Sequence, residues 1–107
     1  MSTAPSPIIL VVSLFIQAGH EAELHQFETE AARIMQKYGG RIERVIRPTV
    51  SVQSGGSPYE IHLVSFPSME RFEAYRKDED LASLASLRQS AIARTEIVIG
   101  EEGESYC

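Results

Sequence analysis

The feature that most constrains this fold is the order of its apolar patterns, which run strand, helix, strand and then repeat once. The first unit spans Ile8 to Val52 and the second spans Tyr59 to Gly100, with a Ser/Gly-rich segment over 54–58 between them. Two right-handed βαβ units side by side give a four-stranded antiparallel sheet with its helices on one face. The sequence therefore predicts a single α+β domain over 1–107, with an N-terminal arm (1–7) and an acidic tail (101–107).

The first unit has a strong strand and a strong helix. Residues 8–16 are almost all apolar, which is typical of a central strand. Residues 20–38 carry an apolar stripe at helical spacing, and Gly39-Gly40 provides a left-handed end for that helix. Residues 41–52 form the next predicted strand, where Pro48 favours an edge position or a bulge near the end of the strand.

The second unit begins with an alternating strand over 59–66. Its Glu60, His62, Val64 and Phe66 share one face, and we expect this face to point away from the helices into a dimer interface. Ser68 is a predicted N-cap for the following helix. Asp78 or Asp80 can cap a further short helix, whose inner face holds Leu81, Leu84 and Leu87, and residues 91–100 form the last strand.

The first strand is apolar on both faces, although helices cover only one face of such a sheet. Leaving the other face in water costs about 25 cal/mol for each Å² of apolar surface. We therefore predict a homodimer that pairs through the open face of the sheet.

Composition narrows the possible partners. The formal net charge of -5 disfavours nucleic acid and anionic membranes. The apolar run at 8–16 is too short for a membrane span, and we expect neither a signal peptide nor an anchor. The single cysteine, Cys107, cannot form an intrachain disulfide or a cysteine metal cluster. A cytoplasmic location fits these features.

Motifs for metals and common cofactors are not found. His20 and His25 are five residues apart, which turns them about 140° from one another on a helix, so a zinc-protease pair is rejected. The Gly-Gly pairs are too isolated to form a phosphate-binding loop. We therefore expect no metal and no cofactor.

Residues 66–88 carry a resemblance to a known family. Phe66-Pro67-Ser68, Glu70, Tyr75 and Leu87-Arg88 resemble the motif of the uncharacterised family named domain of unknown function 1330. The chain differs from that family at two places. It has Tyr75 at a position where tryptophan is commoner, and it has Asp78-Glu79-Asp80-Leu81 where Ser-Pro-Glu-Tyr is usual.

The resemblance extends to the dimeric α+β-barrel superfamily and implies a ferredoxin-like βαββαβ fold that dimerises into an α+β barrel. Relatives in that superfamily include cofactor-independent monooxygenases, isomerases and haem-degrading enzymes, with cavities between sheet and helices or inside the barrel. Haem degradation is disfavoured, since the small haem degraders of this fold use an Asn-Trp-His set and this chain has neither Asn nor Trp.

His62 is the candidate catalytic residue, because a strand histidine beside Glu60 can act as an acid or base near neutral pH. The alternative is a structural histidine bonded to Glu60. Arg88 is a candidate for binding a carboxylate, or else caps the last carbonyls of its helix. Arg94, Glu60 and Tyr75 are further binding candidates. A charge that faces water at the sheet edge explains Arg94 equally well. Tyr75 is most often a core-packing residue, with a hydroxyl that reaches the cavity as the alternative.

Two functions remain open. The first is a dimer whose pocket binds a small organic molecule, as a cofactor-free oxygenase or isomerase that acts on a small acid or aromatic. The alternative is a non-catalytic binding or structural dimer module. A pocket that joins His62, one arginine and an apolar wall would favour the first function, and an interior filled with side chains the second.

Overall fold

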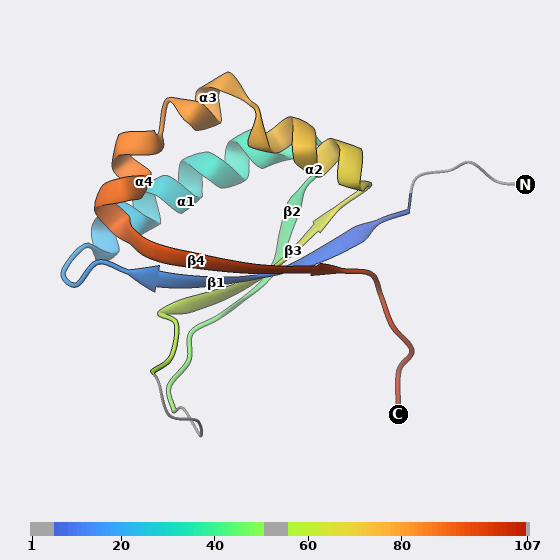
Figure 1. The fold of residues 1–107 in the computed structure, drawn as a ribbon, viewed down its shortest axis with the longest axis horizontal. Coiled ribbons are helices and arrows are strands. Elements are labelled where there is room, and N and C mark those ends of the chain that lie inside the picture. Colours follow the sequence, from blue (N-terminus) through green and yellow to red (C-terminus); the bar gives the residue numbers. More distant parts are fainter. Residues whose placement is uncertain (1–5, 51–55, 107) are drawn as a thin grey trace, which may run out of the picture.

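The computed structural model describes residues 6–50 and 56–106. Figure 1 shows its helices stacked on one side of a twisted sheet. The elements, in chain order, are β1 (Ile8–Ile16), α1 (Glu21–Gln36), β2 (Arg41–Ile46), β3 (Glu60–Phe66), α2 (Met69–Arg76), α3 (Glu79–Ala82), α4 (Ala85–Ala91) and β4 (Ile92–Gly100). The predicted order of elements is confirmed, and within the described residues no helix is long and apolar enough to cross a membrane.

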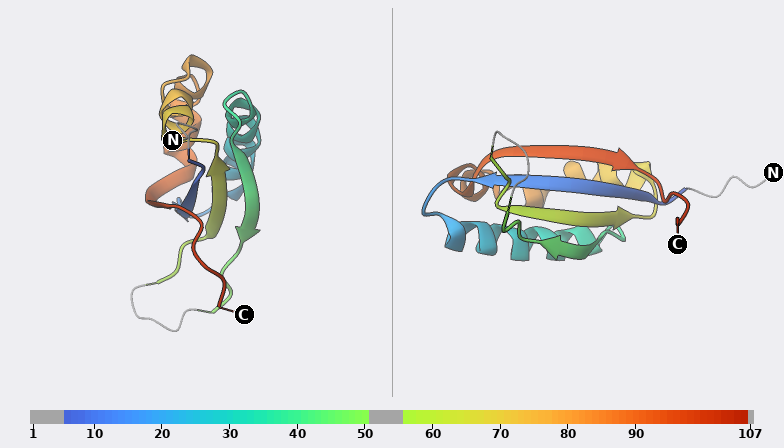
Figure 2. Two further views of the ribbon diagram at one scale, coloured as in Figure 1. Left: turned by 90° about the vertical axis from the view of Figure 1, so that its right-hand side faces the viewer. Right: turned by 90° about the horizontal axis from the view of Figure 1, so that it is seen from below.

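The sheet is antiparallel with the strand order β2-β3-β1-β4, as the view from below in Figure 2 shows. This is the predicted ferredoxin-like arrangement, with β1 at the centre. β2 is an edge strand, as Pro48 suggested, but it ends at Ile46, before that proline. Its bulge lies between Ile42 and Arg44 rather than near Pro48, and the predicted strand residues 51 and 52 lie outside the described residues.

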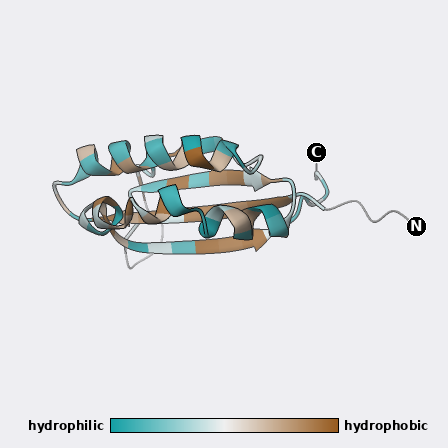
Figure 3. Ribbon diagram, turned by 90° about the horizontal axis from the view of Figure 1, so that it is seen from above, coloured by the Kyte–Doolittle hydropathy of each residue, from teal (hydrophilic) through white to brown (hydrophobic). Residues whose placement is uncertain are grey.

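α1 places its apolar stripe against the sheet. The buried residues of this helix are Leu24, Phe27, Ala31, Ile34 and Met35. The helix ends where Gly39 adopts a φ of 77°, as the Gly-Gly pair predicted. Figure 3 looks onto the helical layer and shows hydrophobic residues gathered in the strands beneath mixed or hydrophilic helices.

The caps of the second unit agree with the sequence. The Ser68 hydroxyl accepts a hydrogen bond from the Arg71 amide, and the Asp78 carboxylate accepts bonds from the amides of Asp80 and Leu81. Leu81, Leu84 and Leu87 pack against the core, as predicted, but the single short helix expected here is divided into α3 and α4, with Leu84 between them. Ala91 is the last residue of α4 rather than the first of the strand.

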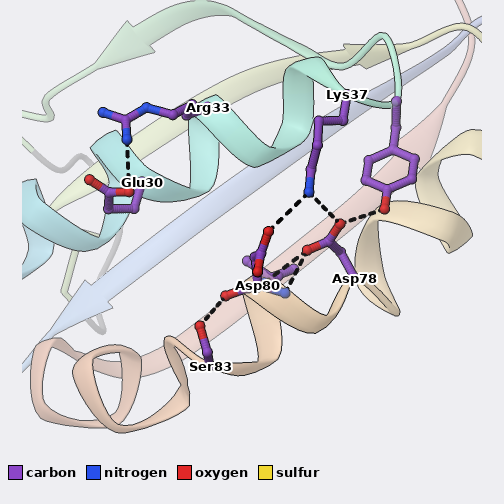
Figure 4. Close-up of polar contacts among 8 residues, drawn as sticks. Glu30, Arg33, Lys37, Asp78, Asp80 and Ser83 are labelled. Carbon is purple, nitrogen blue, oxygen red and sulfur yellow. Dashed lines mark hydrogen bonds and ion pairs between the residues drawn. The ribbon is translucent and has the colours of Figure 1, made fainter.

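Asp78 also joins the α2–α3 junction to the end of α1. Its carboxylate accepts a hydrogen bond from the Tyr38 hydroxyl and lies 3.0 Å from Lys37 Nζ, which is 3.2 Å from Asp80. Figure 4 shows Lys37 between the two aspartates. The hydrogen bonds from Tyr38 and Lys37 hold the pKa of Asp78 well below its usual range. These contacts join the start of α3 to the end of α1.

The core is divided into two clusters. One surrounds Leu14, Phe27 and Ile92, and the other surrounds Leu10, Val64 and Phe66. Val12 of β1 packs against both clusters. The two clusters meet at Val12, between the helices and the middle of the sheet.

Candidate active-site cavity

A cavity of about 330 Å³ lies between the helices and the sheet. Most of its wall is apolar and comes from both core clusters. The apolar lining residues are Leu10, Val12, Leu14, Phe27, Ala31, Met35, Val64, Phe66, Phe72, Leu81, Ile92 and Ile97, and the polar ones are Glu28, His62, Tyr75, Arg76, Arg88 and Thr95. An apolar chamber with a few convergent polar groups is typical of a small-molecule site.

His62 and Glu60 form a buried pair on β3. The His62 side chain is 4% exposed, and its Nε2 lies 2.7 Å from Glu60 Oε1. The other Glu60 oxygen accepts a hydrogen bond of 2.7 Å from the Arg47 guanidinium. Because an ionised carboxylate can only accept hydrogen bonds, Nε2 of His62 is the nitrogen that carries the proton. In the neutral ring, Nδ1 is then the basic nitrogen.

Arg47 keeps Glu60 in its ionised form. Burial of the Glu60 carboxyl acts to raise its pKa, but the hydrogen bonds from Arg47 and His62 outweigh burial, and the pKa lies below the usual value. Glu60 therefore stays negative at neutral pH. A carboxylate behind an imidazole fixes its orientation and tautomer and stabilises the imidazolium that forms when the ring accepts a proton.

Glu28 of α1 faces the other side of the imidazole. Its Oε2 lies 3.6 Å from His62 Nδ1, and its side chain is 20% exposed. Burial raises the pKa of this carboxyl, and the negative charge of Glu60 adds to the increase, while His62 and Arg88 act against it. His62 thus sits between a carboxylate that holds its charge and a carboxyl that resists ionisation.

Arg88 and Tyr75 complete the polar part of the wall. Arg88 Nη2 donates a hydrogen bond of 3.1 Å to Thr95 Oγ1 on β4, so its guanidinium reaches across to the sheet and not to the carbonyls at the end of its own helix. Arg88 is exposed and lies at the rim of the cavity. Burial raises the pKa of the Tyr75 hydroxyl, and Glu28 adds to this effect.

The structure corrects the predicted faces of β3. Glu60, His62, Val64 and Phe66 point toward the helices and are all buried, so the expectation that they face a dimer interface was wrong. The register pairs Leu10 with Val64 and Leu14 with Glu60, both on the helix side of the sheet. Polar residues can occupy this side because Arg47 and Glu28 partner them there.

The predicted site residues are only partly brought together. His62, Tyr75 and Arg88 line the cavity, and Glu60 contacts His62 from behind. Arg94 lies on the open face of the sheet, 3.3 Å from Glu96 and with its guanidinium 4.0 Å from the centre of the Phe15 ring. Its exposure and ion pair match the alternative reading of a surface charge.

Sequence reasoning missed Glu28, Arg47 and Thr95. Glu28 had a readable signal, because it follows Leu24 by four residues and precedes Ala31 by three, which places a carboxyl on the apolar stripe. Arg47 and Thr95 had no such signal. Within residues 6–50 and 56–106, no group of His, Cys, Asp or Glu side chains is arranged to hold a metal ion.

Comparisons with known proteins agree on the fold. The family model described as "Domain of unknown function (DUF1330)" matches residues 10–102. A protein of unknown function from Rhodopseudomonas palustris has a similar structure, with a TM-score of 0.83 and 10% identity over 94% of this chain and 85% of that one. No curated protein matches the sequence.

Two further solved structures share the fold. SnoaB, a cofactor-independent oxygenase from Streptomyces nogalater, has a TM-score of 0.66 and 10% identity over 94% of this chain and 97% of its own. A dabb family protein with a ferredoxin-like fold from Mesorhizobium loti has a TM-score of 0.64 and 14% identity, over 92% of this chain and 98% of its own. Identities this low establish a common architecture and no common activity.

Proposed function

The chain belongs to the family described as Domain of unknown function (DUF1330), and we propose that its cavity binds a small organic molecule and moves protons on it. The observation that carries this proposal is the pair of Glu60 and His62, which directs a basic Nδ1 toward an apolar chamber with an arginine at its rim. These three features together are the arrangement that favours the small-molecule function over a filled interior.

The proposed chemistry starts with proton abstraction. His62 Nδ1 takes a proton from an acidic C–H of the bound molecule, and the electron pair stays on the substrate as an enolate. Glu60 stabilises the resulting imidazolium through Nε2. Because a general base of this kind contributes typically 10²–10⁴-fold in rate, His62 is the residue whose loss should be most visible.

The enolate has two outcomes, which correspond to the two enzyme classes. Return of the proton to another atom gives an isomerase. Reaction of the carbanion with O₂ converts a CH₂ group to C=O, with one oxygen atom in the product and the other released as water, and this gives a cofactor-free oxygenase. The shared fold of SnoaB, a cofactor-independent oxygenase, supports including the second outcome.

Deuterium exchange tests the proposal without knowledge of the substrate. A panel of carbonyl compounds and phenols is incubated with the protein in D₂O, and loss of acidic C–H signals is followed by NMR. We expect exchange to be accelerated and His62→Gln to reduce it by about 10²-fold or more. His25→Gln, an exposed histidine on α1, is the matched control and should exchange like wild type.

A result without exchange would favour the non-catalytic module. If panel compounds bind in the cavity but none of their C–H protons exchange faster than without protein, the catalytic proposal fails. Oxygen consumption, measured with the compounds that do exchange, then separates the isomerase from the oxygenase.

We also propose that the protein works as a homodimer in the cytoplasm and pairs through the open face of the sheet. That face carries Val11, Ile61, Leu63 and Val98, of which Val11 is 37% and Val98 is 68% exposed. Light scattering tests this: Val11→Lys should shift the dimer to monomer while the fold is kept. The control is Val45→Lys, a residue on edge strand β2 that is 54% exposed, and monomeric wild type at micromolar concentration would refute the idea.

A further inference from the structure

The cavity is lined by two arginines, Arg76 and Arg88, which differ in their partners. Arg76 lies 3.4 Å from Glu73 and above the Phe72 ring. Arg88 instead donates to the neutral hydroxyl of Thr95. Among the described residues, no carboxylate oxygen lies within 4.0 Å of the Arg88 guanidinium. The rim of the cavity therefore presents a guanidinium without an ion pair beside an apolar wall, and Glu28 is the carboxyl on which its charge acts at longer range.

Glu28 is the ionisable carboxyl inside the same cavity. The groups that face it are His62 and Glu60 from β3, Tyr75 from α2 and Arg88 from α4. Its surroundings are largely apolar, and burial of the carboxyl raises its pKa. A bound anion would bring a second negative charge close to Glu28 and would raise the pKa of Glu28 further. Glu60 is held in its ionised form by the Arg47 guanidinium that bonds to it, whereas Glu28 is paired only with His62 among the described residues.

We propose that the cavity selects a monoanion with a largely apolar body, and that Glu28 takes up a proton when such a molecule binds. The anionic group would lie at Arg88 and Thr95, and the apolar body would fill the chamber between the two core clusters. This inference rests on the ligand-binding half of the proposed function and not on its chemistry.

Linkage gives the expected pH dependence. If Glu28 is ionised in the free protein and protonated in the complex, each binding event consumes a proton, and affinity falls as pH rises. Neutral and cationic molecules of the same shape do not oppose the ionised carboxyl in this way. They also lack the attraction to Arg88.

Three probes with the same ring and different charges test the selectivity: 2-naphthoate, 2-naphthalenemethanol and 2-naphthylmethylammonium. Titration calorimetry at pH 6, 7 and 8, in buffers of different ionisation enthalpy, gives the affinity and the number of protons taken up. We expect naphthoate to bind about tenfold or more tightly than the other two, as one charge–charge contact near a surface predicts. Its affinity should fall with pH, with uptake approaching one proton.

Three variants assign the proton and the anion. Glu28→Gln should bind naphthoate more tightly than wild type at pH 8 and without proton uptake, because the amide stands in for the protonated carboxyl. Arg88→Gln should lose the preference for naphthoate over the alcohol. His62→Gln should keep the proton uptake, and circular dichroism confirms that each variant is folded.

Several outcomes would overturn the inference, and they are separate from failure of the proposed chemistry. Equal affinity for the three probes, or binding of naphthoate without proton uptake at every pH, rejects it. Uptake that persists in Glu28→Gln and disappears in His62→Gln assigns the proton to the imidazole instead. Deuterium exchange by wild type can succeed or fail independently of these results.

Discussion

Glu28→Gln should stabilise the protein at neutral and alkaline pH. The ordinary pKa of this carboxyl is 4.5, and burial raises its pKa in the folded state. Below pH 4.5 the carboxyl is mostly protonated in the folded and the unfolded protein, and burying the neutral form lowers the free energy of unfolding little. As pH rises through the raised pKa, the unfolded chain ionises more easily than the folded one, so stability falls. Glutamine removes this loss because it cannot ionise.

The size of the effect follows from the linkage relation. Each pH unit by which the folded pKa exceeds the unfolded value corresponds to about 1.4 kcal/mol of unfolding free energy at high pH. In a domain of this size, 1 kcal/mol shifts the melting temperature by roughly 4–8 °C. The variant and wild type should therefore have similar unfolding free energies near pH 4. The variant should become the more stable as pH rises through the raised pKa of Glu28, and the difference should stay constant above it.

Urea denaturation at pH 4, 6 and 8 provides the assay. The control is Glu30→Gln on the same helix, since Glu30 forms an i,i+3 pair with the exposed Arg33, and surface pairs of this kind contribute about 0–1 kcal/mol. The reasoning is refuted if Glu28→Gln is less stable than wild type at pH 8. That result would mean that an ionised Glu28 stabilises the fold through His62, and that this pairing outweighs the cost of burial.

Two other substitutions test the packing around the site. In Gly40→Ala the new methyl would overlap the side chains of Met35 and Phe66, and overpacking of this kind should cost about 1–3 kcal/mol in urea denaturation; an unchanged midpoint would show that Phe66 can move aside. Asp78→Ala should lower the melting temperature by a constant amount from pH 5 to 8. The folded pKa of Asp78 is depressed below its ordinary 3.8, so its contribution is complete above that value and declines only below it. A difference that grows on acidification would contradict this assignment.

Most elements could be predicted from the sequence because each has a local signal, although the single helix expected around residues 81–87 is two short helices, α3 and α4. The apolar run at 8–16 coincides with β1, and the caps at Ser68 and Asp78 make the predicted hydrogen bonds to the amides of their helices. Such signals depend on neighbours within four residues. The end of β2 was harder to predict, because residues 47–50 could continue a strand by composition and do not.

The faces of β3 could not be read in the same way. Alternation separates Glu60, His62 and Val64 from Ile61 and Leu63, but both sets contain residues that a core accepts when they are partnered. The partners are Arg47, which is thirteen residues from Glu60, and Glu28 on a different helix. Only the register of β3 against β1 and the packing of α1 decide which set is buried. The expectation that the face with Glu60 and His62 points away from the helices into a dimer interface was therefore wrong.

The chemistry of the cavity wall argues for a ligand more strongly than the size of the cavity does. The cavity of about 330 Å³ opens toward solvent at the exposed Arg88, so a small molecule can enter it. Its apolar wall comes from both core clusters, and covering such a wall is worth about 25 cal/mol for each Å² of apolar surface. The same wall carries an imidazole oriented by Glu60, and the rim carries an arginine that forms no ion pair within the described residues. A bound molecule with an apolar body and an anionic group accounts for these three features together, and imperfect packing does not account for the oriented imidazole.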